Sequence, residues 1–147
     1  MSLTEQLKAQ MKQAMVAKEK ARLSTIRMAL AAIKQVEVDT RETLTDEQVI
    51  AVLTKMVKQR RDAIEQYQAA GRPELAAAEE AEVLVLKEFL PQPLTDDELH
   101  QIIDAAIKAT GASSIADMGK VMGLVKNQVL GRANMGAVST HIKAKLQ

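Results

Sequence analysis

The chain has 147 residues, of which 47% are hydrophobic and 27% charged, typical of one globular domain or two small ones and unlike a disordered chain. It has no cysteine, which excludes disulfides, a thiol nucleophile and cysteine-ligated zinc. Its 20 basic and 19 acidic residues leave a net charge of +1, so the total charge indicates no particular partner.

The amino-acid usage predicts an all-α fold. Alanine occurs 23 times, whereas the chain has one tyrosine, one phenylalanine and no tryptophan. Helices favour alanine, leucine, lysine and glutamate, while strands favour aromatic and β-branched residues. The longest stretch without a charge, residues 133–142, is too short to cross a membrane, and charges occupy the place of a signal peptide's apolar core. We therefore expect a cytoplasmic protein without a membrane partner.

Helix-start signals and apolar periodicity predict four helices before residue 90. Ser2, Thr45 and Thr95 each begin a capping box, in which a hydroxyl and a carboxyl or amide satisfy free backbone amides. Apolar stripes predict a first helix from Ser2, a second around residues 23–33, a third over 49–64 and a fourth over 73–88. The first stripe consists of Leu3, Leu7, Met11 and Met15.

Two closely spaced prolines, Pro91 and Pro93, interrupt the helical pattern, because proline has a fixed φ and no amide donor. We predict an N-terminal four-helix domain over residues 1–90, a proline-rich linker over 91–94, and a small three-helix domain over 95–147. The smaller domain is near the lower size limit for independent folding.

The second predicted helix carries a row of cations beside its apolar face. They recur every seven residues: Lys20, Arg27, Lys34 and Arg41. One interpretation is that their aliphatic stems cover the edge of the core while the charges reach water. The other is a phosphate-binding stripe, in which Arg27 and Lys34 would contact nucleic acid.

Three charged residues fall within apolar arcs of the third and fourth helices: Arg60, Glu79 and Glu82. Because isolated charges do not stay buried, we predict that Arg60, or else Arg22 or Arg27, pairs with Glu79 or Glu82. A carboxylate metal site would need further converging ligands, and none is obvious. We therefore predict structural ion pairs and no metal or cofactor.

The segment over residues 117–134 is the most informative part of the chain. Its predicted core stripe is Ile115, Met118, Met122, Val125 and Val129. Gly119 and Gly123 share one helical face with Lys126, although glycine within a helix costs about 1 kcal/mol relative to alanine. Either another helix packs closely there, or the bare backbone admits a phosphate or sugar.

Several cations could supply the charge for such a nucleic-acid contact: Lys120, Lys126, Arg132, Lys143 and Lys145. The last two also lie where a helix dipole favours cations, which explains them without a ligand. With so few aromatic residues, base stacking on single strands is nearly excluded. His100 and His141 are predicted to be surface residues rather than a catalytic or metal-binding pair.

Several motifs resemble those of the YqeY family of small bacterial proteins over essentially the whole chain. They are Arg22-Leu23 with Arg27, Gly71-Arg72 with Glu79 and Glu82, Phe89-Leu90-Pro91, Asp117-Met-Gly-Lys-Val-Met-Gly123, and Gly131-Arg132-Ala133. The resemblance implies a two-domain helical protein whose C-terminal lobe is similar to the tail domain of GatB, a subunit of the tRNA-dependent amidotransferase. In that enzyme the tail contacts tRNA, while kinase and amidase chemistry lie elsewhere.

The resemblance carries a candidate RNA-binding role onto Lys120, Gly123, Lys126 and Arg132. It also implies the activity associated with the family, a carbon–nitrogen ligase with glutamine as the amide donor. The residues themselves show no catalytic constellation, because Ser113 and Ser114 with Lys120 lack the Gly/Ser-rich setting of an amidase.

We therefore expect a non-catalytic module that binds tRNA or structured RNA. One alternative is an accessory subunit of a glutamine-dependent ligase, with a protein partner in aminoacyl-tRNA metabolism. The other is a protein–protein adaptor, which an exposed apolar patch would indicate.

Overall fold

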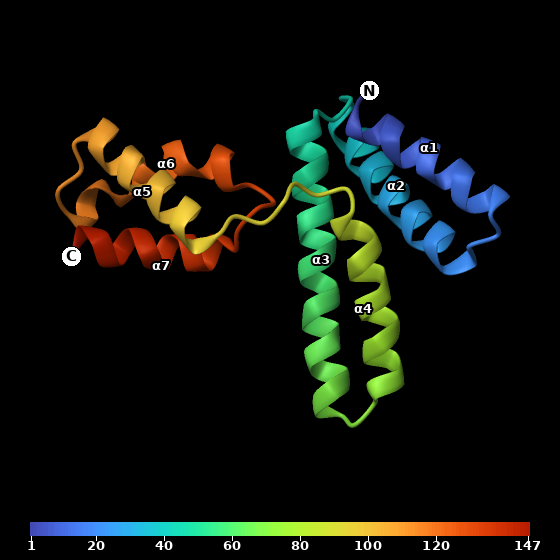
Figure 1. Ribbon diagram of the computed structural model, residues 1–147. Helices are drawn as coiled ribbons and strands as arrows, with labels where there is room; N and C mark the ends of the chain where they lie inside the picture. Colours follow the sequence, from blue (N-terminus) through green and yellow to red (C-terminus); the bar gives the residue numbers. More distant parts are fainter. The chain divides into compact units, whose positions relative to one another are not determined.

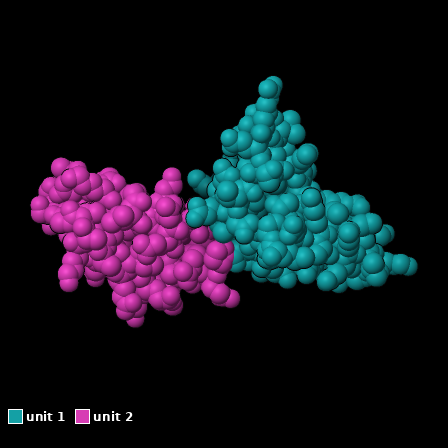
Figure 2. Space-filling view, turned by 90° about the horizontal axis from the view of Figure 1, so that it is seen from above, with its two compact units in different colours: residues 1–90 teal, residues 91–147 magenta.

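The computed structural model describes residues 1–147 and is entirely helical, with no strand (Figure 1). The chain divides into two compact units, Met1–Leu90 and Pro91–Gln147, which Figure 2 colours separately. Each unit has its own hydrophobic core. The all-α fold predicted from the composition is confirmed.

Unit 1 contains four helices: α1 (Leu3–Val16), α2 (Lys20–Thr40), α3 (Asp46–Ala69) and α4 (Pro73–Lys87). The α3 and α4 helices form a long antiparallel hairpin, and α1 and α2 form a second hairpin that packs on one half of the first (Figure 1). Gly71, at φ +71°, makes the left-handed turn between α3 and α4. The core of the unit lies where the two hairpins meet.

Unit 2 contains α5 (Asp96–Thr110), a short 3-10 turn η1 (Ile115–Asp117), α6 (Met118–Val129) and α7 (Met135–Leu146). The α6 helix packs against both α5 and α7. Two side-chain contacts, His100 with His141 and Asp104 with Lys145, each advance by four residues on both helices. The α5 and α7 helices therefore run in the same direction.

The predicted helix starts are confirmed, because all three capping boxes are formed. Two details of the predicted apolar stripes are wrong. Met15 is exposed while Ala14 is buried, and Ile115 lies in the 3-10 turn with 44% of its surface exposed. The 3-10 turn takes Ile115 out of the α6 register, so that Val121 joins Val125 and Val129 in the core instead.

Candidate nucleic-acid interface and inter-helix ion pairs

The most enclosed charge pair of unit 1 joins Arg60 of α3 to Glu82 of α4. Arg60 Nε donates to Glu82 Oε2 at 2.9 Å, and the arginine side chain is only 13% exposed. Its Nη1 donates to the carbonyl of Met56 at 3.2 Å, and its Nη2 lies 3.6 Å from the sulfur of Met28 on α2. The structure thus contains one of the ion pairs predicted from the apolar arcs. Because Arg60 also contacts Met28, it connects α2 with α3 and α4.

Glu79 lies one turn before Glu82 and forms no ion pair of its own. Burial raises the pKa of the Glu79 carboxyl, the negative charge of Glu82 raises it further, and Arg60 acts in the opposite direction. One arginine therefore faces two carboxylates, of which only Glu82 is within ion-pair distance.

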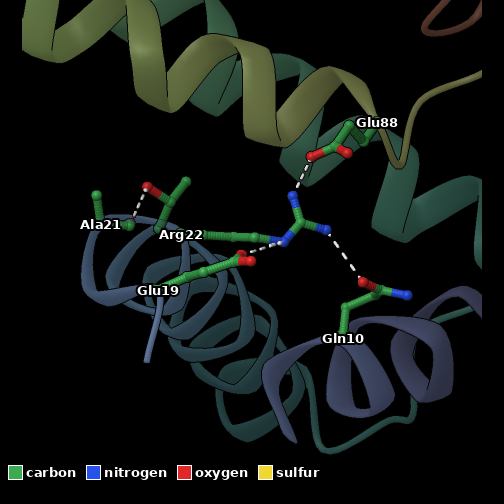
Figure 3. Close-up of polar contacts among 6 residues, drawn as sticks. Gln10, Glu19, Ala21, Arg22 and Glu88 are labelled. Atoms are coloured by element: carbon green, nitrogen blue, oxygen red, sulfur yellow. Dashed lines mark hydrogen bonds and ion pairs between the residues drawn. The ribbon is translucent and has the colours of Figure 1, made fainter. Parts of the chain in front are cut away.

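Arg22 takes partners other than the predicted Glu79 or Glu82 (Figure 3). Its Nη1 pairs with Glu88 at the end of α4, its Nη2 donates to Gln10 of α1 at 3.0 Å, and its Nε lies 3.8 Å from Glu19. Arg22 therefore links α1, α2 and α4. Gln10 and Glu88 were missed from the sequence, because nothing in their spacing indicates which helix ends meet.

Arg27 and Lys34 lie on the side of α2 that points away from buried Ala29 and Ile33. Both are exposed, and neither forms an ion pair. Arg27 lines a cavity together with Leu23 and half-buried Met28. Covering of the core edge and a phosphate-binding stripe both stay predictions for this pair. They remain available to a ligand.

In unit 2, Lys120, Gly123 and Lys126 lie on the exposed side of α6, opposite the buried Val121 and Val125. A side-chain carbon built at Gly119 or Gly123 would meet no atom within 4 Å. Close packing against another helix of unit 2 therefore does not explain these glycines. They leave a bare stretch of helix backbone open to a ligand between two exposed lysines.

Arg132 is engaged within unit 2. Its Nε donates to the carbonyl of Gln92 at 2.8 Å, and its own carbonyl accepts from the amide of Leu94 at 2.8 Å. A longer contact of 3.9 Å joins its guanidinium to Glu98. Arg132 therefore holds residues 92–94 against the turn before α7, and its predicted phosphate contact would compete with this structural task.

The two C-terminal lysines differ in their surroundings. Lys145 Nζ pairs with Asp104 of α5 at 2.6 Å, which reduces its availability to a ligand. Lys143 is exposed and forms no ion pair. Of the predicted contacts in this unit, Lys120, Lys126 and Lys143 remain free.

Asp117 modifies the charge at the start of α6. The amide of Ser113 donates to Asp117 Oδ2 at 3.1 Å. This hydrogen bond is the main cause that lowers the pKa of the Asp117 carboxyl, and the positive charge of Lys120 contributes to the same shift. The carboxylate thus serves the turn before the helix.

The structure brings together two histidines that were expected at separate surface positions. The rings of His100 and His141 meet edge to face, with centroids 4.8 Å apart, and both residues are half-buried. His100 Nδ1 is buried without a hydrogen-bond partner. The sequence held no signal for this pair, because the contact depends on the parallel course of α5 and α7.

The Arg60–Glu82 pair predicts the effect of removing one partner. Glu82→Gln should lower the free energy of unfolding by about 1 to 3 kcal/mol, because it leaves an enclosed guanidinium without its carboxylate. Urea denaturation at neutral pH measures this loss. Glu80→Gln, at an exposed position of the same helix, is the matched control and should change stability by less than about 0.5 kcal/mol. Equal effects would contradict the role assigned to the pair.

Replacing Glu79 by glutamine should raise the free energy of unfolding in a pH-dependent way. Its pKa is raised in the folded state, so its contribution to stability is fully present below the unfolded pKa of 4.5 and is lost as the pH rises through the folded pKa. Glu79→Gln mimics the protonated form and should raise the free energy of unfolding at pH 7. The gain should vanish near pH 4, as measured by urea denaturation at both pH values. A gain of the same size at both would show that the charge is not its cause.

None of the helices is both long and apolar enough to cross a membrane, and no group of three or more metal-ligating side chains could hold a metal ion.

Three relatives illustrate what the chain is similar to. It is 38% identical over 85 residues to "Altered inheritance of mitochondria protein 41, mitochondrial" of Vanderwaltozyma polyspora, covering 57% of this chain and 46% of that protein. The protein of the same name from Lachancea thermotolerans is 38% identical over 87 residues, with 58% and 46% covered. The Saccharomyces cerevisiae protein is 29% identical over 124 residues, with 80% and 66% covered.

The chain thus spans about half the length of the first two relatives and two thirds of the third. A broader match covers both units, because the pattern of the family described as "Yqey-like protein" fits residues 4–146. On this match the chain belongs to the YqeY-like family.

Proposed function

We propose that the protein is a non-catalytic module that binds structured RNA, such as tRNA, through the exposed face of α6 in unit 2. The observation that carries the proposal is the bare backbone at Gly119 and Gly123, which no other part of unit 2 covers. Two helix-weakening glycines on an open face are explained if a bulky, polar ligand must approach the backbone closely.

The charges around this face fit a phosphate backbone. Residues 105–147 carry six basic side chains and one acidic one, a net charge of +5. The ion pairs of unit 2 use Arg132 and Lys145, so Lys120, Lys126 and Lys143 are left to a ligand. Without aromatic platforms, recognition would rest on phosphates, 2′-hydroxyls and shape, as is usual for structured RNA.

The similarity of the C-terminal lobe to the tail domain of GatB supports tRNA as the kind of RNA. An accessory role beside a glutamine-dependent carbon–nitrogen ligase would use the same face, since it requires RNA binding and no chemistry from this chain. The protein would then work where aminoacyl-tRNA is made and modified. We predict the cytoplasm for this chain, although its fungal relatives carry the word mitochondrial in their names.

Binding of labelled tRNA to the full chain tests the proposal. Lys120→Ala with Lys126→Ala should weaken binding and lower the slope of log affinity against log salt by about 1.5, because each phosphate contact contributes roughly 0.7 to 0.9. Arg132 is left intact, since its loss would release residues 92–94.

The matched control is Lys55→Ala with Lys58→Ala, which removes two exposed lysines from α3 in unit 1. It should leave the slope nearly unchanged. Duplex DNA of equal charge should bind more weakly than tRNA. Equal losses in both double variants, or equal binding of DNA, would sink the proposal.

Replacing Gly119 and Gly123 of α6 by alanine should change stability and tRNA binding in opposite directions. Gly119→Ala with Gly123→Ala should raise the free energy of unfolding by about 1 to 2 kcal/mol, because the added methyl groups meet open space and alanine favours the helix. The same change should weaken tRNA binding by obstructing the backbone. Thermal unfolding and fluorescence anisotropy measure the two effects, with Gln128→Ala as a control elsewhere on α6. Unchanged binding by the stabilised variant would contradict the proposed contact.

A further inference from the structure

The outward side of α2 carries a regular pattern that the RNA proposal does not use. Residues on it recur at alternating spacings of four and three, and all seven are exposed: Lys20, Ser24, Arg27, Ala31, Lys34, Val38 and Arg41. We call this row the α2 seam. An average repeat of 3.5 residues is the spacing with which one helix packs along another. Cations alternate in the seam with small or aliphatic residues, and Val38 is 59% exposed.

The surface of the seam is hollowed where a neighbouring helix would insert side chains. A cavity of about 420 Å³ is lined by Lys20, Leu23, Ser24, Arg27, Met28 and Ala31. These six residues form two successive sets with the spacing i, i+3, i+4, i+7, one from Lys20 and one from Ser24. Four such residues make the hole that receives one side chain in knobs-into-holes packing.

A second cavity of about 340 Å³ lies two heptads later. Its lining is Lys34, Glu37, Val38, Arg41, Glu42 and Thr43, of which only Val38 is apolar. Arg41 follows the end of the helix, where its backbone is left-handed at φ 58°. The first cavity is therefore the one suited to an apolar side chain, and the seam follows the helix over its 21 residues, a length of about 30 Å.

The unpaired cations of the seam indicate a partner with acidic side chains. Lys20, Arg27 and Lys34 form no ion pair within the protein, although their heads lie beside the cavities. Residues 20–41, the span of the seam, carry five basic and two acidic side chains, a net charge of +3. A partner helix would place carboxylates opposite these cations, in the way that flanking charges select partners in coiled coils.

We propose that the α2 seam docks an acidic amphipathic helix of another protein. A leucine-sized side chain of that helix fills the cavity lined by Leu23, Met28 and Ala31. Its glutamates or aspartates pair with Lys20, Arg27 and Lys34. Ser24 and Ala31 are small enough to let the helix approach closely. This surface lies in unit 1 and shares no residue with the RNA contacts of unit 2. The failure of one proposal would therefore leave the other unaffected.

A second copy of this chain fits the seam less well. Two α2 helices would oppose cation to cation. The acidic helix α4 has already committed three carboxylates, since Glu74 pairs with Arg72, Glu82 with Arg60 and Glu88 with Arg22. A nucleic acid fits less well too, because phosphate contacts would leave Leu23, Met28 and Ala31 of the first cavity unused.

The test measures binding of a labelled synthetic peptide to the full chain by fluorescence anisotropy. The peptide has 21 residues, matching α2, with leucine and glutamate alternating along one face at the spacing of the seam. The control peptide has the same composition with the residues scrambled off that face. The seam peptide should bind at least about tenfold more tightly than the scrambled one.

Arg27→Glu with Lys34→Glu should weaken binding of the seam peptide to the chain by at least about tenfold. The reason is that two attractions between opposite charges become repulsions. Lys55→Glu with Lys58→Glu, which reverses two exposed charges on α3, should weaken it by less than about twofold. A peptide with lysine in place of glutamate should prefer the Arg27/Lys34 variant over the native chain. This exchange of preference also shows that the variant is folded.

Three results would overturn the proposal. Equal binding of the scrambled peptide would mean charge attraction without a helical fit. Displacement of the seam peptide by tRNA, with loss of tRNA binding in the Arg27/Lys34 variant, would make the seam a nucleic-acid surface. A concentration-dependent dimer in sedimentation velocity, lost in the same variant, would make a second copy the occupant.

Discussion

The architecture of unit 1 depends on a guanidinium that lies almost out of reach of water. Arg60 projects from α3 into apolar surroundings, and such a cation is stable only where a carboxylate meets it. Glu82 does so from α4, which fixes the register of the α3–α4 hairpin. The same guanidinium touches Met28, so the position of α2 is bound to this register. The contact between Arg60 and Met28 consequently also fixes the position of the exposed side of α2.

The features that could be predicted from the sequence are those set by local spacing. The capping boxes at Ser2, Thr45 and Thr95 mark helix starts because their partners lie three residues away. The Arg60–Glu82 contact could be anticipated because both residues interrupt apolar stripes. The features that could not be predicted depend on how helices run relative to one another. The meeting of His100 with His141, across 41 positions, requires α5 and α7 to be parallel.

The two basic surfaces of the protein differ in shape, and this difference separates their proposed ligands. On α6 the backbone itself is laid open at Gly119 and Gly123, a surface suited to a rigid, heavily charged ligand. On α2 the side chains between Lys20 and Ala31 form a cavity, a surface suited to a side chain of another helix. A protein with both surfaces could bring an RNA and a protein partner together without performing chemistry on either. The pattern of the YqeY-like family spans both units.

The scarcity of aromatic residues has a practical consequence for studying such a two-part molecule. Tyr67 and Phe89, the only tyrosine and phenylalanine, both lie in unit 1, and the chain has no tryptophan. Tyr67 is half-buried near the end of α3, so its fluorescence reports on the α3–α4 hairpin alone. Unit 2 contains no tyrosine, phenylalanine or tryptophan and is therefore silent in that range. A single tryptophan placed in either unit would therefore act as an unambiguous reporter, with no native tryptophan emission to subtract.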